Sequence, residues 1–158
     1  MSGHDALLRD KRVLEHRILS GECGEDALAP YLDVLGQIDL RFTGILDFRW
    51  PSVPYPLYFR CGTTDLGNFR QIFVHREYDF PMRFMPSRIL DLGAYVGFAA
   101  SFFAQRFPDA EIVCVESSAE NFRMLALNTS AYPNIRRINA AVWSAATGLR
   151  FAPHSPGD

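Results

Sequence analysis

The sequence predicts an α/β fold built on a mostly parallel β-sheet, and three observations lead to this prediction. Short apolar segments alternate with helix-like segments between residues 88 and 142. The apolar segments are nearly continuous, as expected for strands that are buried on both faces. A turn follows each of them before the helix begins, which is the order of a β-α-β unit. Because these units cross over in the right-handed sense, their strands are expected to run parallel in one sheet.

The first β-α unit is predicted around a glycine loop. Ile89 and Leu90 are strand-type residues, and Gly93 and Gly97 follow where the chain must turn sharply. Glycine adopts the backbone conformations that such a turn requires and lets a ligand approach the backbone. An apolar helix is then expected to begin at Phe98 and to end near residue 108.

Two further strands are predicted after this helix. Residues 111–116 form a short apolar run that ends at Glu116, and the sequence Ser117-Ser-Ala-Glu120 after it has the form of a capping box for a second helix. A third strand is expected over Ile135–Val142, with Gly148–Phe151 as the start of a hairpin partner. The spatial order of the three strands should be 3-2-1, which leaves the first strand as an exposed edge.

The part of the chain before these units is predicted to be a helical lead-in. Residues 5–19 place leucine and isoleucine at helical spacing, which indicates an amphipathic helix. Residues 51–56 hold three prolines and are expected to form a linker. A strand at 57–60 and a helix capped by Thr64 or Asp65 should follow. The predicted organisation is therefore a lead-in over 1–50 and an incomplete cofactor-binding domain over 51–158.

The loop and the next strand end together indicate a site for a nucleoside cofactor. Glu116 ends its strand at the same sheet edge as the glycine loop, where a carboxylate can accept hydrogen bonds from both ribose hydroxyls. The alternative is that Glu116 is only a solvated strand end. Asp91 either contacts the ligand or hydrogen-bonds the amides of its own loop.

The glycine spacing favours S-adenosylmethionine over NAD as the cofactor. A dinucleotide site requires Gly-x-Gly-x-x-Gly, whose middle glycine admits the pyrophosphate. This chain instead has Asp91-x-Gly93-x-x-x-Gly97. An acidic residue at the mouth of the loop would repel a pyrophosphate, whereas it can hold the ammonium of an amino-acid moiety. An NAD-dependent oxidoreductase is the less favoured enzyme class.

Over roughly residues 56–151, the sequence resembles the FkbM-type S-adenosylmethionine-dependent methyltransferases of the class I, Rossmann-like fold. The resemblance rests on the glycine loop together with an ordered set of short motifs: Leu57-Tyr-Phe-Arg60, Gly62-Thr-Thr-Asp65, 69–73, Glu77-Tyr78, Val115-Glu116, Glu120-Asn121-Phe122, Asn128 and Asn139-Ala-Ala-Val142. Two positions depart from the family, which usually has Asn in place of Tyr95 and often has Pro in place of Ser117.

The resemblance implies a methyl transfer from S-adenosylmethionine to a hydroxyl group of a small molecule such as a sugar or polyketide. No catalytic base is identifiable, and no metal site is expected. A complete domain of this family has about seven strands, so the chain would supply only the cofactor-binding half. The alternative is a truncated, non-catalytic remnant that binds the cofactor or a partner. The expected cofactor-binding residues are Asp91, Gly93, Ala94, Tyr95, Gly97, Glu116, Ser117, Ala140 and Ala141.

Composition excludes several other classes of protein. The 158 residues carry a net charge of −2, and no basic stripe with interleaved aromatic residues indicates a nucleic-acid partner. No apolar stretch reaches the ~20 residues of a membrane span, and the first residues lack a secretory signal pattern. Three widely spaced cysteines favour reduced thiols and a cytoplasmic location. We also expect self-association through the exposed sheet edge.

Overall fold

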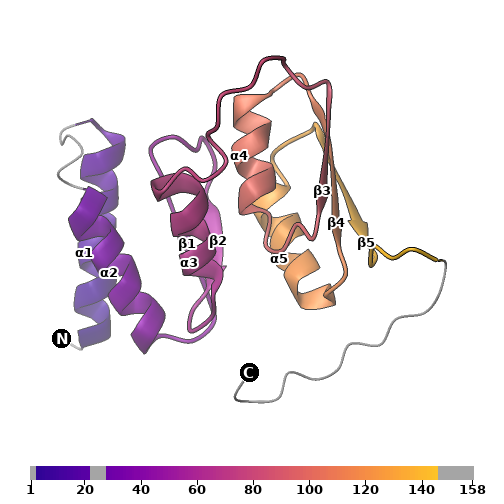
Figure 1. Ribbon diagram of the computed structural model, residues 1–158. Helices are drawn as coiled ribbons and strands as arrows, with labels where there is room; N and C mark the ends of the chain where they lie inside the picture. The colour runs from indigo at the N-terminus through magenta and orange to yellow at the C-terminus, as the bar shows by residue number, and fades with distance from the viewer. Residues whose placement is uncertain (1–2, 22–27, 146–158) are drawn as a thin grey trace.

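The structure is a computed structural model that describes residues 3–21 and 28–145. Its elements form successive layers: a helical pair, a hairpin with a short helix, two helices, and a sheet (Figure 1). In chain order they are α1 (Gly3–Leu19), α2 (Leu28–Arg41), β1 (Ile45–Phe48), β2 (Leu57–Arg60), α3 (Asp65–Phe69), the π-helix η2 (Arg70–Val74), β3 (Arg88–Leu92), α4 (Phe98–Arg106), β4 (Glu111–Glu116), α5 (Ala119–Thr129) and β5 (Ile135–Asn139).

The sheet confirms the predicted α/β fold class. Strands β3, β4 and β5 are neighbours in that order, and both pairs run parallel. The order along the sheet is therefore 3-2-1, as predicted, with β3 at the edge. The register aligns Leu90 with Val113 and Val113 with Arg136. Since parallel strands end at the same edge, the loops after Leu92, Glu116 and Asn139 come together there.

Helices α4 and α5 lie between two apolar cores. One core fills the space between these helices and the sheet and includes Ile112, Cys114 and Leu125. The other is rich in aromatic residues and joins Phe98 of α4 to Phe48 and Phe69 of the N-terminal layers. The N-terminal segment thus covers the outer face of the two helices, where it contacts apolar side chains such as Phe98 of α4 and Met124 of α5.

The opposite face of the sheet is covered by no element of the described part of the chain (Figure 1). Leu90 and Leu92 of β3 point to this face and are 62% and 52% exposed. Val113 and Val115 of β4 lie next to them in register. We call this surface the open sheet face.

Two details of the predicted β-α units were wrong. The cap of α5 is Ser118, whose hydroxyl accepts a hydrogen bond from the backbone N–H of Asn121, and not Ser117. The third strand ends at Asn139 rather than at Val142. The predicted hairpin partner at Gly148–Phe151 lies outside the described residues.

The N-terminal region contains more structure than the sequence analysis predicted. The helix expected over residues 5–19 is present as α1, but α2 and β1 were missed. The proline-rich segment 51–56 joins β1 to β2, which pair antiparallel. Thr64 precedes α3 at the cap position but makes no side-chain cap hydrogen bond. Among the described residues, no helix combines the length and the apolar character that a membrane crossing requires.

Candidate functional site

Both glycines of the loop after β3 have the backbone conformation that the sequence analysis required of them. Gly93 and Gly97 have φ angles of +86° and +87°, which side-chain-bearing residues rarely adopt. A Cβ on Gly93 would meet no atom within 4 Å, whereas a Cβ on Gly97 would lie 2.8 Å from Cδ1 of Leu125. Gly93 therefore leaves space beside the loop, and Gly97 brings α4 close to α5.

Tyr95 links the glycine loop to two distant parts of the chain. It also has a positive φ, +50°, in the region that asparagine tolerates better than most residues. Its backbone N–H donates to Oε2 of Glu116 at 3.0 Å. Its hydroxyl donates to Oδ1 of Asp65 at 2.7 Å and lies 2.7 Å from Oγ1 of Thr64. The side chain therefore turns toward β2 and α3.

Glu116 is held between the two loops at the end of the sheet. It is only 7% exposed. Besides the bond from Tyr95, its Oε1 accepts from the backbone N–H of Ser118 at 2.7 Å. Each carboxylate oxygen has a second lone pair, so this group can accept further hydrogen bonds. The carboxylate fixes the positions of both loops at the end of β4.

Asp91 is a half-buried residue whose carboxylate has one buried, unsatisfied oxygen. Its Oδ2 has no hydrogen-bond partner in the described part of the chain. Burial, and then the negative charge of Glu116, raises the pKa of Asp91. An unpartnered buried acceptor beside a second carboxylate is costly, and a cation placed there would stabilise it.

A cavity of about 360 Å³ opens at the carboxyl-terminal edge of the sheet. It brings together four of the predicted site residues, Gly93, Ser117, Ala140 and Ala141. The other five do not line it: Ala94 and Gly97 are buried in the turn, and Asp91, Tyr95 and Glu116 make the contacts described above.

Part of this cavity wall was not predicted from the sequence. Leu92, Val115, Val142 and Trp143 also line it, and the indole of Trp143 is 65% exposed. Trp143 lies two residues after Ala141 of the Ala-Ala pair, which was the available signal. Because an aromatic ring offers a flat apolar surface, Trp143 is suited to stack on a planar base.

An ion-pair network anchors Tyr95 from the N-terminal side. Arg60 donates from Nε and Nη2 to both oxygens of Asp65, each at 2.8 Å, and also to Asn121 and Glu120 of α5. Asp65 is fully buried. Burial alone would raise the pKa of Asp65, but hydrogen bonds from Arg60 and Tyr95 outweigh it and lower the pKa. The resemblance motifs contained these residues without indicating that they meet.

Asn128 joins the same layers at a second point. Its amide accepts from the backbone N–H of Tyr58 at 2.7 Å and donates to the carbonyls of Tyr58 and Val96. The side chain is 2% exposed, so these bonds are shielded from water. Asn128 lies in the last turn of α5 and holds β2 in place.

Within residues 3–21 and 28–145, no group of three or more His, Cys, Asp or Glu side chains has a spacing that could hold a metal ion.

Comparisons with known proteins give only distant likenesses. No protein-family profile matches the chain, and no curated protein matches it. Among solved structures, a SAM-dependent methyltransferase from Agrobacterium tumefaciens is 20% identical, with a TM-score of 0.43 over 61% of this chain and 32% of that one. Coclaurine N-methyltransferase, bound to N-methylheliamine and SAH, is 14% identical, with a TM-score of 0.38 over 89% of this chain and 38% of that one. The chain thus spans 32% of the first protein and 38% of the second.

Proposed function

We propose that the carboxyl-terminal edge of the sheet binds S-adenosylmethionine. The observation that carries the proposal is the pair of carboxylates, Asp91 and Glu116, at neighbouring strand ends beside the glycine loop. The unsatisfied oxygen of Asp91 fits an ammonium group, which would supply the missing hydrogen bond and positive charge. NAD fits less well, because its pyrophosphate would add negative charge next to two carboxylates.

The cavity supports the same assignment for the nucleoside part of the cofactor. Its volume of about 360 Å³ lies in the usual range of ligand pockets, about 300–1,000 Å³. Glu116 does not line the cavity, so in the proposed complex the ribose lies between the cavity and this carboxylate, whose remaining lone pairs accept from the ribose hydroxyls. Trp143 and the backbone at Ala140 and Ala141 flank the adenine.

The proposed reaction is the methylation of a hydroxyl group on a small molecule such as a sugar or polyketide, carried out in the cytoplasm. S-adenosylmethionine, when bound, supplies an electrophilic methyl group. The described residues would bind and orient the cofactor, and the loop bonds of Glu116 and Tyr95 would hold the site rigid. Since the electrophile is already activated, positioning of the acceptor oxygen should supply most of the rate. None of the described residues is assigned as a base.

The second candidate is a cofactor-binding or partner-binding remnant without activity. It is favoured by the open sheet face, because no element of the described residues covers that face and could form a wall for an acceptor substrate (Figure 1). Binding without turnover would support this candidate, and turnover would exclude it.

Binding is tested by isothermal titration of the chain with S-adenosylhomocysteine and with NAD. We expect saturable binding of S-adenosylhomocysteine and weaker binding of NAD. Ala141→Leu should weaken binding because the larger side chain occupies part of the cavity, whereas Ala131→Leu, at an exposed position outside the cavity, should not. Equal binding to both variants, or tighter binding of NAD, would contradict the proposal.

The proposed contact between the Glu116 carboxylate and the ribose is tested with two variants on β4. Glu116→Gln removes the charge at the sheet edge, and Glu111→Gln makes the same change at the exposed start of β4. Loss of charge-assisted bonds to ribose should weaken binding by about 2 kcal/mol, or about thirtyfold. Affinities of the two variants within twofold of each other would remove Glu116 from the site.

A further inference from the structure

A second cavity lies against the last turn of α4, far from the glycine loop. It has a volume of about 270 Å³ and combines aromatic and polar side chains from three segments of the chain: Ser52, Phe73, Arg76, Asp79, Phe102, Gln105 and Arg106. Helix α4 has nine residues and is therefore about 13 Å long. Gly97 precedes its first residue, so the two sites lie at opposite ends of the helix.

The charges of this cavity leave one net positive charge. Asp79 pairs with both Arg76 and Arg106, so one carboxylate serves two guanidinium groups. Arg106 is further occupied by the carbonyls of Tyr78 and Phe80, to which it donates at 3.0 and 2.6 Å. Arg106 therefore also anchors the segment before β3, and because Arg76 and Arg106 share one carboxylate, one positive charge remains uncompensated.

Arg76 presents an open hydrogen-bonding edge to the cavity. Its Nε and Nη2 both donate to Oδ2 of Asp79, which occupies one side of the guanidinium group. No hydrogen bond to another described residue uses Nη1. The end formed by Nη1 and Nη2 is thus available, and it has the fork geometry that binds a carboxylate through two parallel hydrogen bonds.

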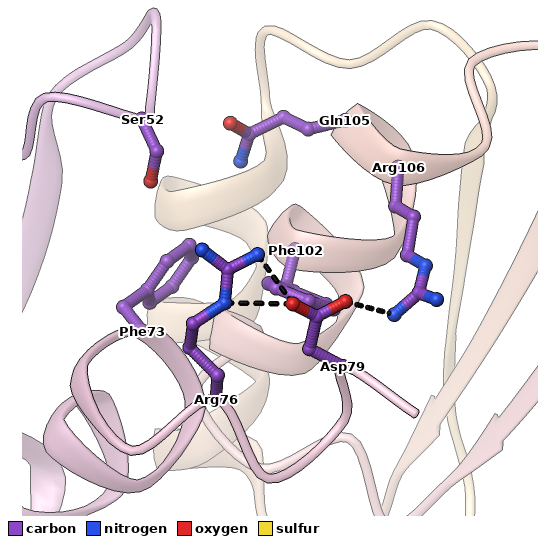
Figure 2. A pocket seen from close by; sticks show the side chains of 7 residues that line it. All are labelled: Ser52, Phe73, Arg76, Asp79, Phe102, Gln105 and Arg106. Carbon is purple, nitrogen blue, oxygen red and sulfur yellow. Dashed lines mark hydrogen bonds and ion pairs between the residues drawn. The ribbon is translucent and has the colours of Figure 1, made fainter. Parts of the chain in front are cut away.

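Other groups converge on the same space. Figure 2 shows the hydroxyl of Ser52 and the amide of Gln105 pointing toward the open end of Arg76, with Phe73 beside it. The Gln105 nitrogen donates one hydrogen to the carbonyl of Ser101 at 2.8 Å, which leaves its second hydrogen for a ligand. Phe73 and Phe102 provide an apolar wall, with ring centroids 5.9 Å apart.

We propose that this cavity is a binding site for a small organic carboxylate with an apolar body. Arg76, Ser52 and Gln105 donate to the carboxylate, and the apolar part packs against Phe73 and Phe102. A single uncompensated positive charge matches a monoanion better than a dianion. The site is separate from the proposed cofactor site and does not depend on it.

Benzoate is the probe for this site, and benzyl alcohol is its uncharged counterpart. Isothermal titration should show saturable binding of benzoate with a one-to-one stoichiometry, and binding of benzyl alcohol weaker by about tenfold or more. Arg76→Gln should weaken benzoate by a similar factor, and Ser52→Ala by a few fold. Arg88→Gln, at an exposed arginine on β3, should leave the affinity unchanged.

Thermal melts by circular dichroism establish that each variant is folded before its affinity is compared. The proposal is overturned if benzoate shows no saturable binding, if benzyl alcohol binds as tightly, or if Arg76→Gln and Arg88→Gln have the same effect. If Arg76→Gln fails to fold, the benzoate affinity of Ser52→Ala is compared with that of Arg88→Gln instead. The Ser52 hydroxyl makes no hydrogen bond to the described part of the chain, so its removal should not affect folding.

Discussion

The two loop glycines should differ sharply in how much an alanine destabilises the protein. Both have φ angles near +86°, so an alanine at either position incurs a similar backbone penalty of about 1–2 kcal/mol. Only at Gly97 would the new Cβ also collide with neighbours, at 2.8 Å from Cδ1 and 3.3 Å from Cα of Leu125 and 3.1 Å from Cγ2 of Thr129. Overpacking of this kind adds about 1–3 kcal/mol.

Gly97→Ala should therefore lower the free energy of unfolding by about 2–5 kcal/mol, and Gly93→Ala by about 1–2 kcal/mol. For a chain of this length, each kcal/mol corresponds to about 2–4 °C in melting temperature. Urea unfolding followed by circular dichroism measures both values, and the same midpoint for the two variants would refute the packing argument.

Ligand affinity should rank the two variants in the opposite order. Gly93 lines the cavity at the sheet edge, whereas Gly97 does not. Once each variant is studied well below its melting temperature, Gly93→Ala should weaken S-adenosylhomocysteine more than Gly97→Ala does. The opposite ranking of affinities would mean that the cavity is not where the cofactor binds.

Three further outcomes are expected. Because burial and a neighbouring carboxylate raise the pKa of Asp91, the folded state holds its proton more tightly than the unfolded state does, so this group makes the protein less stable as the pH rises from about 3.9 through the raised pKa. Asp91→Asn should remove this pH-dependent loss of stability, raise the melting temperature at pH 7 and weaken cofactor binding. An unchanged dependence of melting temperature on pH would contradict this. Tyr95→Phe loses the bond to Asp65 and should lower the free energy of unfolding by about 1–2 kcal/mol in urea titrations, and a change within error would show that the bond is dispensable. Among the described residues, no strand pairs with the outer edge of β3, and a second copy of the chain could supply one. Light scattering should therefore show dimers or larger species that Leu90→Lys disperses and Leu40→Lys, at another exposed leucine, does not.

The β-α units were predictable because their signals are local. The apolar run 111–116 and the glycine turn specify β4 and the start of α4 without reference to the rest of the chain. Strand β1 was missed because its partner lies across a proline-rich segment that is typical of a linker. A four-residue antiparallel strand is defined mainly by its pairing, which short-range patterns do not contain.

The candidate site was predictable in its backbone but not in its side-chain contacts. The glycine conformations and the position of Glu116 follow from the strand-turn-helix order. The direction of the Tyr95 side chain depends on Asp65, which lies 30 residues earlier in the chain and is itself fixed by Arg60. The unsatisfied oxygen of Asp91 likewise results from tertiary burial, which no spacing of residues in the sequence indicates.

The buried amide of Asn128 has a consequence for how the protein is made. This amide hydrogen-bonds both the backbone N–H and the carbonyl of Tyr58, which lies 70 residues earlier in the chain. At a synthesis rate of about 5–20 residues per second, Asn128 is synthesised about 4–14 s after Tyr58 of β2. During this interval, the aromatic side chains that later pack on α4 have no partner layer. The N-terminal half is therefore the part of the nascent chain most in need of protection from aggregation on the ribosome.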